Sequence, residues 1–241
     1  MLKKVFFPNS KNFYIWVNSV FLLVLVVFNY VAPLAVVFAY FFETILIGFF
    51  HIIKLWLVIT KGKPTEKDGK LPSGFGMIGF FIFHYGMFVA VQSIFAFSFF
   101  ESSIPGIDSG FNLINNYWVL LNEKGMGIIL ASLFFSNLTY FYNNFLTNKK
   151  YHDYTAAEIF FKPYVRIFIQ QFVVLFSGFF FILFSAGYAA ALLLILLRLP
   201  VDLLIVSIKK DSPVFDETMK KYSNSYDHYL ELKKKYQEFS E

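Results

Sequence analysis

The residues most able to do chemistry in this chain lie inside long apolar stretches of its sequence. A charged side chain at the centre of a membrane costs roughly 2.5 to 3.5 kcal/mol on insertion scales, so each one needs a partner or a function. The candidate binding cluster consists of Glu43, His84, Gln92, Asn137, Arg166, Gln171, Arg198 and Asp202. We therefore predict a polar cluster inside the membrane, which serves either helix packing or ligand binding.

Arg198 and Asp202 are the most informative pair in this set. They are four residues apart, which places them on one face of a helix. In one interpretation they form a structural ion pair at a kink introduced by Pro200. In the other, Arg198 meets Glu43 or an anionic ligand, as in a substrate or counter-ion site. The spacing leaves both interpretations open.

Glu43, His84 and Asp202 are the candidate metal ligands, because a catalytic zinc normally has three His or carboxylate ligands. The chain has no cysteine, which excludes disulfides, thiolate metal sites and iron–sulfur clusters. The sequence therefore assigns no metal or other cofactor, and the cofactor stays unknown.

Two further polar residues lie on the same predicted helix as Glu43. His51 lies roughly 80° round this helix from Glu43, so we place it in a different patch. Lys54 is expected to extend to the cytoplasmic interface.

Several membrane-spanning helices are needed to position such a cluster. The 241 residues are 57% hydrophobic and 15% charged, whereas soluble domains average about 25% charged residues. Apolar runs of about twenty residues without alternation exclude a membrane β-barrel. We predict an all-α polytopic bundle of about six spans, at residues 13–30, 34–59, 74–100, 126–146, 164–184 and 187–208. The third and fourth spans are joined by a long connection, residues 101–125.

The lysines predict how this bundle is oriented. They gather in residues 1–12, 61–70, 149–162 and the tail, and Lys124 stands alone on the other side. The positive-inside rule then places both termini in the cytoplasm and the multi-pass chain in the cell's inner membrane. Residues 1–12 form a basic N-terminus, 13–208 the transmembrane domain, and 209–241 a charged tail with a short helix. Residues 154–162 are expected to lie along the cytoplasmic interface.

No motif in the chain names a reaction, since GxSxG, HExxH and phosphate-binding glycine loops are all missing. The lipid bilayer is the expected partner, with a second copy or a membrane complex as a further one. Nucleic acid is not expected as a partner. The net charge of +5 comes from lysines in short segments that flank the apolar runs, which is the pattern of membrane topology.

For the function, we predict a small-ligand binding or transport module, or a subunit of a membrane complex. The alternative is an intramembrane enzyme acting on a lipid, with or without a metal, in which Glu43 or His84 is the general base. The sequence does not decide whether the chain is an enzyme.

Five stretches resemble an uncharacterised family of bacterial and archaeal polytopic membrane proteins, a domain of unknown function of the DUF6498 type. They are AYFFETILIGFFHIIKLW, FFIFHYGMFVAVQSIF, FFSNLTYFYNNFL, KPYVRIFIQQFVVLFSG and RLPVDLL, which occur in this order. The resemblance covers roughly residues 29–202. It implies that the family's characteristic polar positions correspond to Glu43, His84, Arg166 and Asp202.

The resemblance also implies a departure from the family pattern. Histidines are usual where this chain has Gln92, Asn137 and Gln171. Amides are poor ligands for transition metals, so this replacement disfavours a metal enzyme here even if relatives bind metal. The family has no known activity to carry over.

Overall fold

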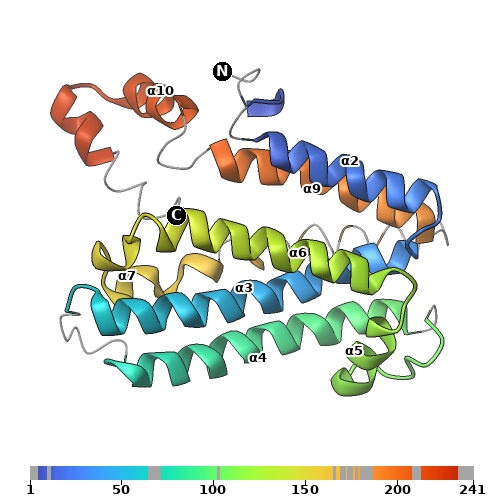
Figure 1. Cartoon of the computed structure of the whole chain (residues 1–241). Helices are drawn as coiled ribbons and strands as arrows, with labels where there is room; N and C mark the ends of the chain where they lie inside the picture. Colours follow the sequence, from blue (N-terminus) through green and yellow to red (C-terminus); the bar gives the residue numbers. More distant parts are fainter. Residues whose placement is uncertain are drawn as a thin grey trace.

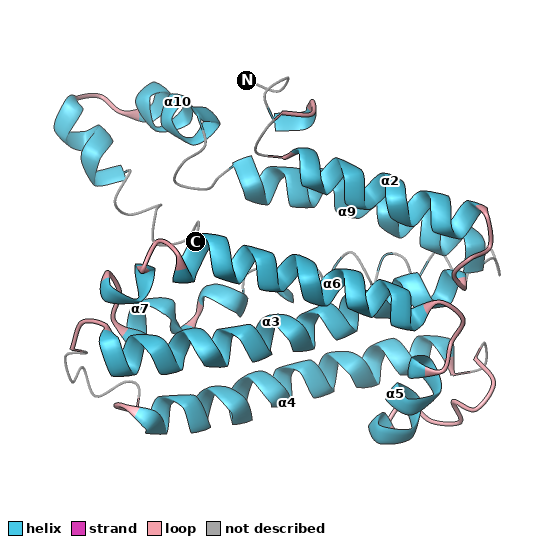
Figure 2. Cartoon of the chain, viewed as in Figure 1, coloured by secondary structure: helices cyan, strands magenta, loops and turns pink. Residues whose placement is uncertain are grey.

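The computed structural model describes residues 5–9, 12–64, 72–101, 104–164, 167–168, 172, 176, 179, 187–207 and 213–232. Within these residues every regular element is a helix and none is a strand, which confirms the all-α prediction (Figure 2). The expected fifth span, residues 164–184, lies mostly outside the described residues.

The described helices can be followed along the chain in Figure 1. They are α2 (Phe13–Val27), α3 (Pro33–Lys61), α4 (Phe75–Phe100), α5 (Leu113–Leu121), α6 (Met126–Phe141), α7 (Ala156–Phe160), α9 (Gly187–Ser207) and α10 (Pro213–Tyr222). A π-helical turn, η1 (Tyr142–Leu146), extends α6, and a 3-10 turn, η2 (Lys150–His152), precedes α7. Helix α5 forms inside the connection that we expected between the third and fourth spans.

Two of these helices, α3 and α4, are long and apolar enough to cross a membrane. Leu113–Leu121 and Met126–Leu146 would make a third span if this pair, bent by 98°, counts as one. Gly125 lies in the bend with a φ of +82°, a conformation that glycine adopts without steric cost. Length and composition thus support two or three crossings within the part of the chain that the structure describes. The count of six and the orientation of the termini remain predictions.

Helix α3 occupies the centre of the bundle. It packs against α4, α6 and α9, while α2 runs along α9 (Figure 1). Phe38 of α3 stacks on Phe97 of α4 with ring centroids 5.2 Å apart, and it meets Phe100 edge-on at 5.3 Å. Aromatic pairs of this kind contribute about 0.5 to 1.5 kcal/mol beyond their burial. The hydroxyl of Tyr85 also donates to the carbonyl oxygen of Thr44 at 2.7 Å, which fixes α4 against α3.

Helix α3 ends at Lys61, and at the next residue, Gly62, the chain passes very close to the segment before α7. A Cβ atom at this position would lie 2.5, 2.6 and 2.8 Å from the carbonyl oxygens of Val58, Tyr151 and Tyr154. The amide of Lys63 donates to the carbonyl oxygen of Tyr154 at 3.1 Å. Glycine is required for this approach because it has no Cβ atom. The contact joins the end of α3 to the short turns that follow α6.

Candidate functional site

Arg198 is the centre of an ion-paired cluster between α3 and α9. Its Nη2 atom lies 2.5 Å from Oε2 of Glu43, and its Nε atom lies 2.8 Å from Oδ2 of Asp202. The guanidinium carbon sits 3.8 Å from the centre of the Tyr40 ring. The two pairings that the sequence offered as alternatives therefore coexist in one cluster.

Helical spacing explains how these side chains meet. Tyr40 and Glu43 are three residues apart on α3, and Arg198 and Asp202 are four apart on α9, so each helix presents its pair on one face. Arg198 and Glu43 are 8% and 3% exposed, which requires each charge to have a close counter-charge. Pro200 lies inside α9 between Arg198 and Asp202, where it removes one backbone hydrogen bond.

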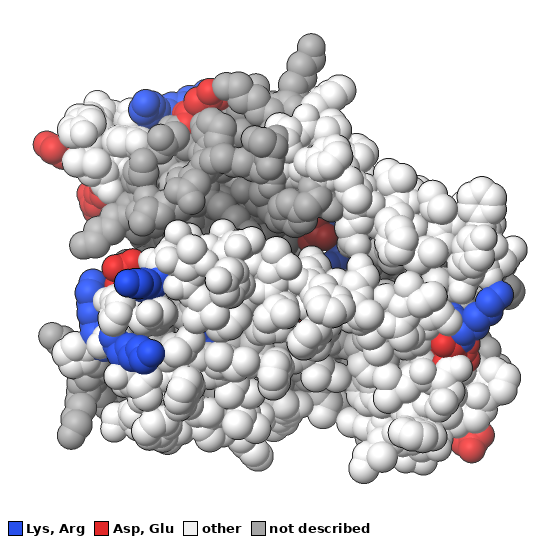
Figure 3. Space-filling view, in the orientation of Figure 1, with Lys and Arg blue, Asp and Glu red and all other residues white. Residues whose placement is uncertain are grey.

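The cluster is closed on one side and open on the other. The Nη1 atom of Arg198 is buried and has no hydrogen-bond partner in the described structure. The side chain of Asp202 is 22% exposed, compared with 4% for Glu43. In Figure 3 acidic and basic atoms lie side by side in a recess near the middle of the face shown. Asp202 is thus the most exposed of the three charged members of the cluster.

His84 is bonded elsewhere. Its Nδ1 atom lies 2.8 Å from the hydroxyl of Tyr164, and its ring stacks on Phe80 with centroids 5.5 Å apart. These contacts are with α4 itself and with Tyr164. That His84 acts together with Glu43 and Arg198 stays a prediction.

Two of the remaining predicted site residues, Gln92 and Asn137, lie on α4 and α6. Gln92 is buried on α4, and Asn137 donates from Nδ2 to the carbonyl oxygen of Leu133 on its own helix at 2.9 Å. Arg166 and Gln171 lie outside the described residues. Among the residues that the structure describes, no three His, Cys, Asp or Glu side chains are close enough to hold a metal ion. The candidate ligands Glu43, His84 and Asp202 therefore do not converge.

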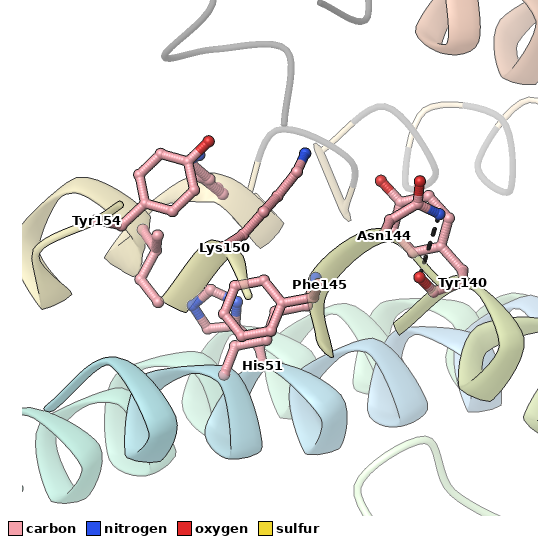
Figure 4. Close-up of a pocket in the computed structure, with 9 residues that line it drawn as sticks. His51, Tyr140, Asn144, Phe145, Lys150 and Tyr154 are labelled. Atoms are coloured by element: carbon pink, nitrogen blue, oxygen red, sulfur yellow. Dashed lines mark hydrogen bonds between the residues drawn. The ribbon is translucent and has the colours of Figure 1, made fainter. Parts of the chain in front are cut away.

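A second polar region lies at the end of the bundle where α3 meets η1, η2 and α7. A cavity of about 40 Å³ opens there, and basic side chains gather over this end of the molecule (Figure 3). Figure 4 shows the side chains that surround it. The lining residues are His51, Lys54, Tyr140, Asn144, Phe145, Lys150, Tyr154, Ile159 and Lys162. We call this region the His51 pocket.

From the sequence we predicted that His51 lies in a different patch from Glu43 and that Lys54 extends to the cytoplasmic interface. The pocket as a whole was not predicted. Most of its walls come from residues 140–162, which contain a π-helical turn, a 3-10 turn and a five-residue helix. None of these has a hydrophobic period long enough to detect. One usable signal was present: Thr155 and Glu158 form a capping box that marks the start of α7.

Fold and site together define an all-helical protein with candidate membrane spans, an ion-paired cluster between two helices and a basic pocket at one end. The chain belongs to a family of unknown function, DUF6498, whose family model matches residues 1–216. The match includes both polar regions. No curated protein and no solved structure matches the chain.

Proposed function

We propose that the chain is a multi-pass protein of the cell's inner membrane that binds or transports a small charged solute, with Arg198 and its carboxylate partners as the ion-binding centre. One observation carries this proposal. A single guanidinium is shared between Glu43, which is buried on α3, and Asp202, which is partly exposed on α9. Charges in this setting mark ion pathways and counter-ion sites in membrane proteins.

The arrangement allows an ion to alter helix packing. Asp202 pairs with Arg198 within α9, whereas Glu43 links Arg198 to α3. A cation bound at Asp202 would weaken the first pairing and leave Arg198 paired with Glu43. Two states that differ in this pairing would be biased by ion binding, as coupling requires. Pro200 gives α9 a point at which it can bend between the two states.

The surface of α4 supports a position in the membrane. Large apolar side chains recur at helical spacing along one of its faces, and the protein itself does not cover them. They include Phe83, Met87, Val91 and Phe95, which are 70%, 51%, 48% and 58% exposed. A lipid environment would cover this face. We further propose six crossings with cytoplasmic termini, on the basis of the lysine distribution.

The enzyme alternative has less support from the geometry. Glu43 is 3% exposed and is engaged by Arg198, and the Nδ1 atom of His84 is bonded to Tyr164. A general base must lie within hydrogen-bond reach of the proton that it removes. A buried carboxylate under a guanidinium does not offer that access to a lipid substrate.

Infrared spectroscopy of the purified protein in nanodiscs tests the proposal. Added sodium should shift the carboxylate stretching band of the protein, and Asp202→Asn should remove that shift. Asp108→Asn is the matched control, because Asp108 is an exposed acidic residue outside the cluster. If the two variants respond identically to sodium, Asp202 does not bind the cation. Lack of any response in the parent protein would leave the cluster as a structural brace and overturn the proposal.

A further inference from the structure

We propose that the His51 pocket binds a phosphate-bearing anion, as a second site separate from the Arg198 cluster. The chemistry is that of a phosphate group, carried either by a lipid headgroup or by the free ion. The proposal does not depend on the function proposed for Arg198, because the two regions share no lining residue.

The pocket concentrates positive charge. Three of its nine lining residues are lysines and none is acidic. Aromatic rings hold two of these ammonium groups at the walls. The Nζ atom of Lys54 lies 5.6 Å from the ring centre of Tyr140 and 5.4 Å from that of Phe145, and the Nζ atom of Lys162 lies 4.0 Å above the ring of Tyr154. Cation–π contacts of this kind help to position an ammonium group.

His51 is the observation that points to a ligand. The residue is 5% exposed, and its Nε2 atom is buried without a hydrogen-bond partner among the described residues. An unsatisfied buried polar atom costs about 1 to 3 kcal/mol, so native structures rarely leave one. Phe81 covers the ring at a centroid distance of 4.8 Å. An anion in the pocket would give Nε2 a partner when this nitrogen carries the proton.

The walls of the pocket are fixed by the backbone around them. The carbonyl oxygen of Lys61 accepts a hydrogen bond from Nδ1 of His152 at 2.7 Å. Asn144 donates from Nδ2 to the carbonyl oxygen of Tyr140 at 3.1 Å, across the start of the π-helical turn (Figure 4). Glu158, a nearby acidic residue, caps α7 through Thr155. The site is therefore formed before a ligand arrives, which lowers the entropic cost of binding.

Size and charge select the class of ligand. The cavity of about 40 Å³ exceeds the roughly 10 to 15 Å³ that a cavity needs to hold one water, so a small anion fits. Lysine is a common phosphate ligand, acting as a point charge. The positive-inside rule accounts for lysines at this end of the bundle. It accounts neither for a buried histidine nor for a cavity, and these two features favour a specific site over a diffuse basic surface.

The test uses the full chain in nanodiscs and has two arms. In the first, nanodiscs of phosphatidylcholine are titrated with inorganic phosphate by calorimetry, against chloride at the same ionic strength. In the second, nanodiscs also contain phosphatidic acid, and native mass spectrometry counts the lipids that stay bound. Saturable binding in the first arm alone identifies the free ion, and retention in the second alone identifies a headgroup. Binding in neither arm overturns the proposal.

Variants decide whether any binding occurs in the pocket. Lys54→Gln and Lys150→Gln should each weaken it about tenfold, equivalent to about 1.4 kcal/mol. Lys149→Gln is the matched control, since it removes the same charge one residue outside the pocket. Equal loss in Lys149→Gln and Lys150→Gln would show diffuse surface attraction and overturn the proposal. Both pocket lysines are partly exposed, so the variants should fold, and Lys150→Gln decides the outcome if Lys54→Gln does not.

Discussion

Arg198 and Lys54 are both cations that lie among apolar helices, but the groups that contact the charge differ. Arg198 is ion-paired with carboxylates from two helices. Lys54 lies between two aromatic rings in a pocket that also contains two further lysines. In the first region the described structure supplies opposite charge. In the second it collects like charge and leaves a histidine nitrogen unsatisfied. The first region should therefore make the larger contribution to stability, and the second should govern the binding of phosphate.

Removing Arg198 should have the largest effect on stability. Arg198→Ala leaves Glu43 buried without this counter-charge, and breaking a buried pair in this way typically costs about 3 to 5 kcal/mol. Denaturant unfolding in mixed micelles, followed by circular dichroism, measures the loss. The double variant Glu43→Gln with Arg198→Met removes both charges and should recover much of it. A loss below about 1 kcal/mol for Arg198→Ala would mean that the cluster does not hold α3 to α9.

Gly62→Ala should have the next largest effect, and it should reach the pocket. The new methyl group would collide with three carbonyl oxygens, and overpacking of this kind costs about 1 to 3 kcal/mol. Hydrogen exchange should rise in residues 150–155, and phosphate binding should fall with it. Gly79→Ala is the matched control: a Cβ atom there meets nothing within 4 Å, so this change should stabilise α4 slightly. Similar exchange in both variants would show that the contact at Gly62 does not frame the pocket.

The same two regions show what sequence could predict. Long apolar runs identified the main helices, and the spacing of Arg198 and Asp202 placed them on one helix face, because helical periodicity is a local property. The choice of Glu43 as a partner stayed open, since it depends on how α9 packs against α3. The pocket could not be predicted from the sequence. Its walls come from short turns after α6, and the close approach at Gly62 depends on contacts between segments that are distant in sequence.

Asp202→Asn should have a smaller effect on stability than either change above. The ion pair with Arg198 is partly exposed, and pairs of this kind contribute about 1 kcal/mol or less after solvent screening. Arg198 would still pair with Glu43 through Nη2. The unfolding experiment described for Arg198→Ala measures the difference. A loss as large as that of Arg198→Ala would show that the two carboxylates are equally structural, and the contrast between the buried and exposed members would disappear.

Replacing His51 should have the smallest effect on stability and a clear effect on binding. His51→Leu keeps an apolar contact with Phe81 and removes a nitrogen that has no partner in the described structure. Deleting an unsatisfied polar atom is close to neutral or stabilising, so the free energy of unfolding should change by less than about 1 kcal/mol. Phosphate binding should nevertheless weaken, because the ligand loses its buried donor. Unfolding and calorimetry on the same preparation measure both quantities. A large loss of stability with unchanged binding would reverse the assignment, making His51 a core residue and leaving the lysines as a surface that attracts anions without a defined site.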